Sequence, residues 1–590
     1  MKRQSLSSAL TAVIAIPILI ILLGFGWMFT RGSWGLLGSG VTSEPTAMIF
    51  IPKNAPAMVS LLVNPDRLAT VRQALVPANL KKQTQQEFEA FRDSLLGSSD
   101  VRYEQAIKPW LGNEITAAIT NLDVDRDAET GNQVGYLLAL TTKNTQRSRE
   151  FLQLFWQKRA VSPEDLVFEQ YQGTQIIYGK VKQANLDIPL TLASAVVGDR
   201  FVLFANSPKV LRNAISNVQA PDLNLANSLN YQRAIAHLPS KRIGLAYLNL
   251  PQFSAALGDR SILNQLDTLT GKESVTYQGL AIGFSANRQG LVADVALVPT
   301  QLSDRTEVAT LSQPIAALQY LPANSQFIAA GTQLQSTWQG ILEGTKGYSK
   351  LSDWIQRPIQ SLESRWHLML TDDVLNWVKG EYALALLPAK MLPAKTAKAT
   401  QDWVLVVDRS DETAFQQGIQ HLNDLAQQQG LTPGKIQLGQ RSVDAWTRLA
   451  SPPTVALDRS SSVTDRNVAD RNVTDSTLQV QVAGVHTSID HYELFAPSIE
   501  VLDTLLKDRS AASSAVSRFK GLNTPNNGYL QVSWPPLKAQ FEKDLPGFKL
   551  LELSAQPLLG HLQSLTLSGY GQQEGITTGA MLLEFRKADA

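Results

Sequence analysis

The sequence has 590 residues, of which 44% are hydrophobic and 18% charged, and its 53 basic and 52 acidic residues give a formal net charge of +1. This length allows roughly three or four domains of ~150 residues, and the composition lies within the range of globular chains. The balanced charge provides no global basic field for nucleic acid. Cysteine is absent, which excludes disulfides, thiolate metal sites and a cysteine nucleophile and suits an oxidising space outside the cytoplasm.

An uncharged apolar run at residues 9–29 predicts a transmembrane anchor. As a helix it would extend ~32 Å, against a hydrocarbon core of ~30 Å. Lys2 and Arg3 precede it, so the positive-inside rule places residues 1–8 in the cytoplasm and the bulk of the chain on the far side. Residues 30–46, rich in Gly, Ser and Thr, predict a flexible tether.

A cleaved signal peptide is the alternative interpretation of this segment. Its apolar region would be unusually long, because ~7–15 residues is typical, and no Ala-x-Ala site follows. We therefore expect an uncleaved, single-pass anchor.

The rest of the chain predicts two tandem copies of one domain, at residues 47–299 and 316–590, joined by a linker at 300–315. The first copy predicts the following elements in chain order: a Pro/Asn turn at 51–54, a strand at 57–63, a mostly helical stretch at 65–108, strands at 115–122 and 134–141, a helix with Phe151, Leu152 and Phe155 on one face, a strand at 201–204, a helix with Val210, Leu211, Ala214 and Ile215 facing inward, and the return strand of a hairpin at 290–298.

The second copy repeats this order of elements. Its elements are a turn at 321–324, strands at 326–331, 382–387 and 402–408, a helix capped by Ser410 with Phe415, Ile419 and Leu422 on one face, a strand at 492–495, a helix with Val501, Leu502, Leu505 and Leu506, and a return strand at 575–583. Trp110 precedes Glu114 by the same four-residue step that separates Trp377 from Glu381. The alternative is that alternating apolar segments resemble one another without common origin.

These elements predict an α+β fold, with mainly antiparallel sheet and packed helices in each copy. Residues 451–477 are a low-complexity insertion that we expect to be disordered. The acidic loop from Asp123 to Glu129 resembles a calcium loop, but Ala128 and Val134 occupy positions that an EF-hand gives to Gly and Glu.

No motif in the sequence carries chemistry. The six histidines lack the His-Glu-x-x-His spacing of a zinc protease, and neither a Gly-x-Ser-x-Gly elbow nor a phosphate loop is present. His486 and His491 would lie on opposite faces of a strand, and the adjacent Asp372 and Asp373 suit a helix N-terminus. We interpret Trp110 and its counterpart as core residues, although an aromatic pocket wall is the alternative. We assign no catalytic, cofactor-binding or metal-ligating residue and expect no cofactor.

The N-terminal arrangement resembles a known family. A short basic start, one span and a tether lead to Phe50-Ile51-Pro52-Lys53-Asn54-Ala55-Pro56 and then Ser60-Leu61-Leu62-Val63-Asn64-Pro65. This pattern is similar to the cyanobacterial proteins classed as domain of unknown function 3352. The resemblance implies a cyanobacterial membrane, with the bulk of the chain in the periplasm or thylakoid lumen, and it carries no functional residues.

We therefore expect a non-enzymatic, membrane-anchored binding or assembly protein with an unidentified protein partner and no nucleic-acid partner. The alternatives are a hydrolase-like envelope enzyme with its site in the cleft between the copies, and a lipid or pigment carrier. Clustered carboxylates or histidines with perturbed pKa values in a pocket would favour the enzyme, a flat apolar patch the partner, and a deep apolar cavity the carrier.

Overall fold

A computed structural model describes most of the predicted elements. The described residues are 44–63, 103–126, 133–160, 166–183, 186–257, 277–286, 290–301, 307–308, 311–322, 324–332, 334–335, 363, 369–388, 402–450, 479–507, 519, 521–536, 538–539 and 562–585. None of the helices within these ranges is long and apolar enough to cross a membrane. The predicted anchor, tether, helical stretch at 65–102 and insertion at 451–477 lie outside them.

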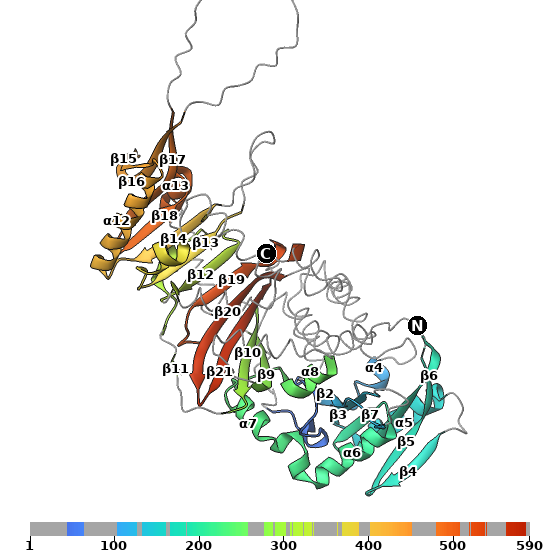
Figure 1. The fold of residues 1–590 in the computed structure, drawn as a ribbon. Coiled ribbons are helices and arrows are strands. Elements are labelled where there is room, and N and C mark those ends of the chain that lie inside the picture. Colours follow the sequence, from blue (N-terminus) through green and yellow to red (C-terminus); the bar gives the residue numbers. More distant parts are fainter. Residues whose placement is uncertain are drawn as a thin grey trace, which may run out of the picture. The chain divides into compact units, whose positions relative to one another are not determined.

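The described residues form two compact units (Figure 1). The first unit comprises the residues up to Gln313 together with those from Phe519 onward, and the second comprises those from Pro314 to Lys507. The end of the chain joins the first unit because its strands pair with the sheet of that unit.

The first unit contains a long antiparallel sheet. Its strands are β1 (Ala57–Leu61), β2 (Leu111–Asn121), β3 (Gly135–Thr142), β4 (Val167–Tyr171), β5 (Thr174–Gln183), β6 (Leu186–Val197), β7 (Phe201–Ala205), β8 (Gly244–Asn249), β9 (Tyr277–Ala286), β10 (Gly290–Pro299), β11 (Glu307–Val308), β19 (Tyr529–Ser533), β20 (Leu562–Gln573) and β21 (Ile576–Phe585). Hydrogen-bonded neighbours follow the order β4–β5–β6–β7–β3–β2–β1–β8–β9–β10–β21–β20–β19, with the short β11 also on β20. The predicted return strands at 290–298 and 575–583 are β10 and β21, and these two strands pair with each other.

Helices cover both faces of this sheet. They are the 3₁₀ helices η2 (Ala47–Phe50), η5 (Pro221–Leu223) and η6 (Leu225–Asn227), and the α-helices α4 (Tyr103–Ala106), α5 (Thr145–Arg159), α6 (Pro208–Gln219), α7 (Leu229–Ala236) and α8 (Leu250–Leu257). Strand β3 is apolar on both sides, as expected of a strand covered on both faces. Leu137 and Ala139 join the main core with η2, α6 and α7, whereas Tyr136 and Leu138 point to the opposite face.

The main core depends on α6, which the sequence predicted. Ser207 caps this helix by accepting a hydrogen bond from the Lys209 N–H, and Pro208 occupies its first turn. The predicted inward residues Val210, Leu211, Ala214 and Ile215 are all buried.

The second unit repeats part of this order in a smaller antiparallel sheet. Its strands are β12 (Phe327–Gly331), β13 (Tyr382–Leu386), β14 (Trp403–Asp408), β15 (Thr432–Leu438), β16 (Arg441–Ala450), β17 (Gln479–Ile489) and β18 (Tyr492–Ala496), and its helices are η7 (Ala316–Tyr320), the π-helix η8 (Leu370–Leu375), α12 (Glu412–Gln428) and α13 (Ile499–Lys507). Neighbouring strands follow the order β15–β16–β17–β18–β14–β13–β12. The prediction of Ser410 as the helix cap is wrong by one residue, because the side chain of Asp411 accepts the hydrogen bond from the Ala414 N–H. The prediction of an α+β fold with mainly antiparallel sheet is confirmed.

A buried carboxylate, that of Glu114, holds the 3₁₀ helix η2 against the sheet of the first unit. Oε2 of Glu114 accepts hydrogen bonds from the Thr46 N–H (2.8 Å) and the Thr46 hydroxyl (2.6 Å). Oε1 accepts from the Ala47 N–H (2.9 Å) and the Thr116 hydroxyl (2.9 Å). The carboxylate thus satisfies free N–H groups at the N-terminus of η2 and attaches this helix to β2.

The second unit contains the same device. Oε2 of Glu381 accepts hydrogen bonds from the N–H groups of Ala316 (3.0 Å) and Ala317 (3.3 Å) at the start of η7, and from the Tyr492 hydroxyl (2.6 Å). The preceding tryptophans also correspond, since the indole N–H groups of Trp110 and Trp377 each donate to the carbonyl four residues earlier.

We expect Glu114→Gln to lower the free energy of unfolding by roughly 2–3 kcal/mol, because the amide would turn an N–H donor toward backbone donors and lose the charge-assisted bonds. Denaturant unfolding of the full-length protein in detergent measures this change. The matched control is Glu150→Gln at an exposed position of α5, where we expect a change of at most ~0.5 kcal/mol. Equal effects of the two variants would contradict the role given to Glu114.

Candidate functional site

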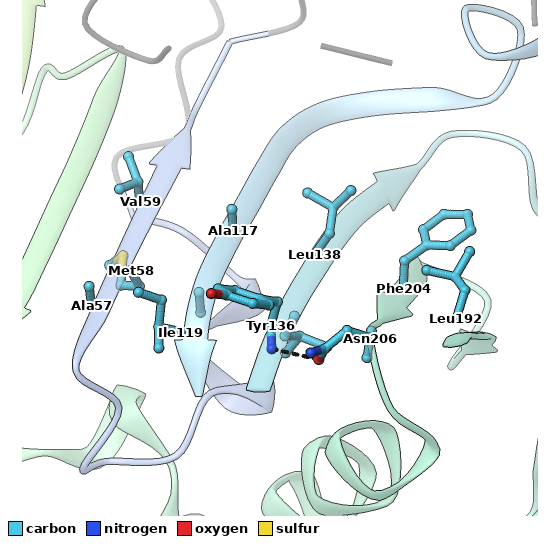
Figure 2. Close-up of a pocket in the computed structure, with 13 residues that line it drawn as sticks. Ala57, Met58, Val59, Ala117, Ile119, Tyr136, Leu138, Leu192, Phe204 and Asn206 are labelled. Carbon is cyan, nitrogen blue, oxygen red and sulfur yellow. Dashed lines mark hydrogen bonds between the residues drawn. The ribbon is translucent and has the colours of Figure 1, made fainter. Parts of the chain in front are cut away.

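An apolar pocket lies on the sheet face opposite α6, over strands β1, β2, β3, β6 and β7 (Figure 2). Its volume is about 310 Å³. Two rows of residues that are neighbours in strand register build its floor. The first row is Val59, Ala117, Leu138 and Phe204, and the second is Ala57, Ile119 and Tyr136.

Aromatic and aliphatic clusters flank the pocket. On one side, Trp110 and Leu152 are buried with Val202, and Phe155 of α5 packs edge-on against Phe204 with ring centroids 5.7 Å apart. On the other side, Leu250 of α8 belongs to the same cluster as Ala57 and Ile119. The described helices therefore pack at the two ends of this face. Between them Ala57, Val59 and Ile119 are buried, at 3–6% exposure, whereas Ala117, Leu138 and Phe204 are half-buried.

Trp110 does not line the pocket. It is 1% exposed, and its ring lies 5.2 Å from that of Phe151 in the neighbouring core cluster. The interpretation of Trp110 as a core residue is confirmed, and the aromatic pocket wall comes from Phe204 and Tyr136.

Two of the described lining residues, Tyr136 and Asn206, carry polar side chains. Asn206 uses its amide internally, accepting from the Tyr136 N–H (2.8 Å) and donating to the Val134 carbonyl (2.7 Å). Burial raises the pKa of the Tyr136 hydroxyl above its ordinary value, which keeps the phenol neutral at physiological pH. The described lining therefore offers a neutral hydroxyl, at Tyr136, because the amide of Asn206 is satisfied within the protein.

None of the described histidines lines the pocket. His237 bonds the Arg233 carbonyl, His421 contacts Asp373 at 2.8 Å, and His491 lies at a turn against Tyr492. His486 is buried on β17, where Nδ1 lies 2.6 Å from Oε1 of Glu493. His367 and His561 fall outside the described residues. Within the described ranges, no three His, Asp or Glu side chains are arranged to hold a metal ion.

Two oppositely charged buried residues, Asp294 and Arg242, lie in the first unit on the side of the sheet that α6 and α7 cover. Asp294 of β10 is 4% exposed, and burial raises its pKa to about 6, against the opposing effect of Arg242. Arg242 is also 4% exposed, and its Nε and Nη1 atoms find no hydrogen-bond acceptor among the described residues. Neither residue lines the pocket, so of these shifted pKa values only that of Tyr136 belongs to a lining residue.

Sequence reasoning did not find the pocket. Its defining residues are small or apolar, whereas the sequence features that indicate chemistry are histidines, acidic pairs and glycine motifs. The available signal was the pair Ala117-Ala118 within an otherwise bulky strand, together with Ala57 on the preceding strand. These positions become neighbours only through the register of β1 and β2.

Comparison with known proteins finds a matching family model whose description assigns no function. A family model described as "Protein of unknown function (DUF3352)" matches residues 10–585. No curated protein matches the sequence. Two solved structures, "Structure of crystal form I of TP0453" and "Structure of crystal form III of TP0453", are each 8% identical, with TM-scores of 0.23 and 0.21. They align with 44% and 43% of this chain and cover 82% and 80% of their own, and scores this low carry no argument about fold or function.

The buried Asp294 predicts a pH dependence of stability. Because its folded pKa of about 6 lies above the ordinary value of 3.8, its contribution to stability is largest below pH ~4 and is lost as the pH rises through 6. We expect acidification from pH 7 to 4 to stabilise the parent relative to Asp294→Asn by up to ~3 kcal/mol. Melting temperatures of the two proteins across this range measure the difference, and parallel curves would contradict the assignment.

Proposed function

This chain belongs to the DUF3352 family, and we propose that it is a non-enzymatic, membrane-anchored binding protein that holds an apolar ligand in the pocket of its first unit. The observation that carries this proposal is the described part of the pocket lining, where Tyr136 is the only side chain that could act as an acid, base or nucleophile. Among these described lining residues there is no carboxylate or histidine to support the alternative of an envelope hydrolase. Apolar binding needs only the area and shape that the two residue rows provide.

The predicted anchor supports a location for this binding at a membrane. Glu114 holds Thr46 and Ala47, so the predicted tether ends at a fixed point of the first unit. Residues 30–46, fully extended, would reach at most ~60 Å. We propose that residues 1–8 face the cytoplasm and that the pocket lies near the far surface of a cyanobacterial membrane, in the periplasm or the thylakoid lumen.

We also propose a protein partner, as the sequence analysis predicted. Leu449 of β16 and Val480 of β17 are directly paired and 65% and 61% exposed. Adjacent large apolar side chains with this exposure are candidates for a contact surface.

We further propose that residues 47–299 and 316–590 are two copies of one domain, linked by 300–315. The strand register supports this proposal. The pairs Ala57–Ile119 and Leu61–Ile115 correspond to Phe327–Leu386 and Gly331–Tyr382. The same correspondence continues through β3 and β7, which match β14 and β18. Matched registers across four strands, together with the matched capping carboxylates, are more specific than a shared apolar pattern.

The membrane topology can be tested directly because the chain contains no cysteine. We expect a single cysteine at Ser5→Cys to be protected from a membrane-impermeant maleimide applied from the periplasmic or lumenal side, and Leu154→Cys, at an exposed position of α5, to be labelled. Detergent permeabilisation, which should allow labelling of both variants, is the control. The reverse labelling pattern would contradict the proposed topology.

The binding function can be tested by native mass spectrometry of the full-length protein extracted gently from its own membrane. We expect a stoichiometric apolar small molecule that is lost when Ala57→Phe and Ala117→Leu are combined to fill the pocket. Retention of fold in the variant is checked by its circular dichroism. A parent protein without any bound apolar molecule, and unable to take one up, would contradict the proposal.

A further inference from the structure

The chemical class of the ligand follows from what the pocket cannot solvate. Among the lining residues that the structure describes, none is Lys, Arg, His, Asp or Glu. An ionised carboxylate, phosphate or ammonium group placed in this pocket would lose its hydration without gaining a counter-charge, which costs several kcal/mol. The part of the ligand inside the pocket is therefore uncharged.

The size of the pocket excludes a helical peptide. One turn of α-helix, about 5.4 Å long and about 10 Å across, occupies roughly 420 Å³. The pocket volume of about 310 Å³ is smaller and corresponds to the lower end of small-molecule sites. A narrow hydrocarbon chain fits this volume and the apolar rows beneath it.

One hydrogen-bonding group remains available to such a ligand. The amide of Asn206 is satisfied within the protein, whereas the hydroxyl of Tyr136 forms no hydrogen bond with any described residue. Figure 2 shows the Tyr136 ring lying across the sheet beside Ile119. A ligand with an ester carbonyl or a hydroxyl near its apolar chain would satisfy this phenol.

We infer that the ligand is an uncharged lipid, an acyl ester or long-chain alcohol, whose hydrocarbon chain lies over Ala117 and whose oxygen bonds the Tyr136 hydroxyl. This inference rests on the proposed apolar-ligand function and specifies its ligand. Its shared chemistry is a hydrocarbon chain with a neutral oxygen, whether the lipid comes from the bilayer or is free.

The second unit indicates which residues determine the room for this chain. At the register positions of Ala57, Ala117 and Tyr136, the second sheet has Phe327, Leu384 and Trp403.

One position changes in the opposite sense, since Val59 corresponds to Ala329. At both alanine positions, however, the second sheet has the larger side chain, Phe327 or Leu384. Ala57 and Ala117 are thus the specificity-determining residues of the first unit, and the same strand order folds with larger side chains in their place.

The test is a chain-length series on the full-length protein held in amphipol. Primary alcohols, methyl esters and ionised fatty acids of increasing length compete with a neutral polarity-sensitive dye, with empty amphipol as the partition reference. We expect the affinity of alcohols and esters to rise about fourfold per methylene until the pocket is full and then to level off. Ionised acids of the same length should bind at least ~30-fold more weakly.

Variants then locate the chain and the oxygen. Ala117→Leu should move the levelling point to chains shorter by about three methylenes, because its side chain occupies that space. Tyr136→Phe should weaken esters and alcohols about fivefold while leaving an alkane unchanged. The matched controls are Ala236→Leu, at an exposed position of α7, and Tyr178→Phe, a tyrosine outside the pocket lining.

The possible outcomes distinguish a failure of this ligand assignment from a failure of the proposed apolar-ligand function. Equal binding of ionised acids and esters, or an unchanged levelling point in Ala117→Leu, overturns the ligand class while apolar binding stands. Absence of binding by every member of the series overturns the proposed function as well. Reconstitution in nanodiscs of deuterated phospholipid distinguishes the sources, because native mass spectrometry would find a mass-shifted ligand from the bilayer and an unshifted one from a free lipid.

Discussion

The position of the buried Glu114 carboxylate is the constraint on which the first unit depends. A carboxylate at 2% exposure is tolerated only where donors surround it, and here the donors are the first N–H groups of η2 and two threonine hydroxyls. The hydroxyl oxygens of Thr116 and of Ser60 on β1 lie 2.8 Å apart, so the hydrogen-bond network of Glu114 reaches the next strand. The chain is consequently fixed where it enters the fold, and β1 is placed beside β2 in one register.

That register determines the pocket. A shift of β1 by one residue would turn Ala57 and Val59 into the α6 core and bring Met58 to the open face. Strands that are apolar on both faces need cover on both, and η2, α6 and α7 supply it on one side. On the other side α5 and α8 cover the ends, and the small side chains between them leave space where bulkier residues would close it.

The sequence predicted those features that local pattern determines. Periodicity located α6 and its buried residues, and alternation located the strands, because burial of one face imposes a period on neighbouring residues. The sequence predicted the cap of α12 at Ser410 instead of Asp411. Both residue types suit an N-cap, and only the hydrogen bond from the Ala414 N–H to the Asp411 side chain decides between them. The capping role of Glu114 and the pocket could not be predicted, because their partners come together only in the fold. Glu114 and Thr46 are 68 residues apart, and Ala117 meets Val59 only through the register of β1 and β2.

Under the proposed duplication, the two units have diverged in opposite directions at the same positions. Where the first unit has Ser194, Val196 and Val202 near its aromatic cluster, the second has His486, Ser488 and Glu493. Glu493 accepts a hydrogen bond from Ser488 at 2.6 Å and lies 3.7 Å from Arg409.

Such buried charges contribute little net stability, since desolvation offsets much of their attraction. Val196 and Val202, at the positions of Ser488 and Glu493, show that the strand arrangement does not require these polar groups. The replacement of apolar side chains by hydrogen-bonded charged ones restricts this region to one side-chain arrangement. A charged network permits fewer alternative packings than an apolar cluster does. The second unit therefore has larger side chains at the positions of Ala57 and Ala117, and a partly buried polar network in place of Val196 and Val202. This is the division expected if one copy binds and the other maintains the fold.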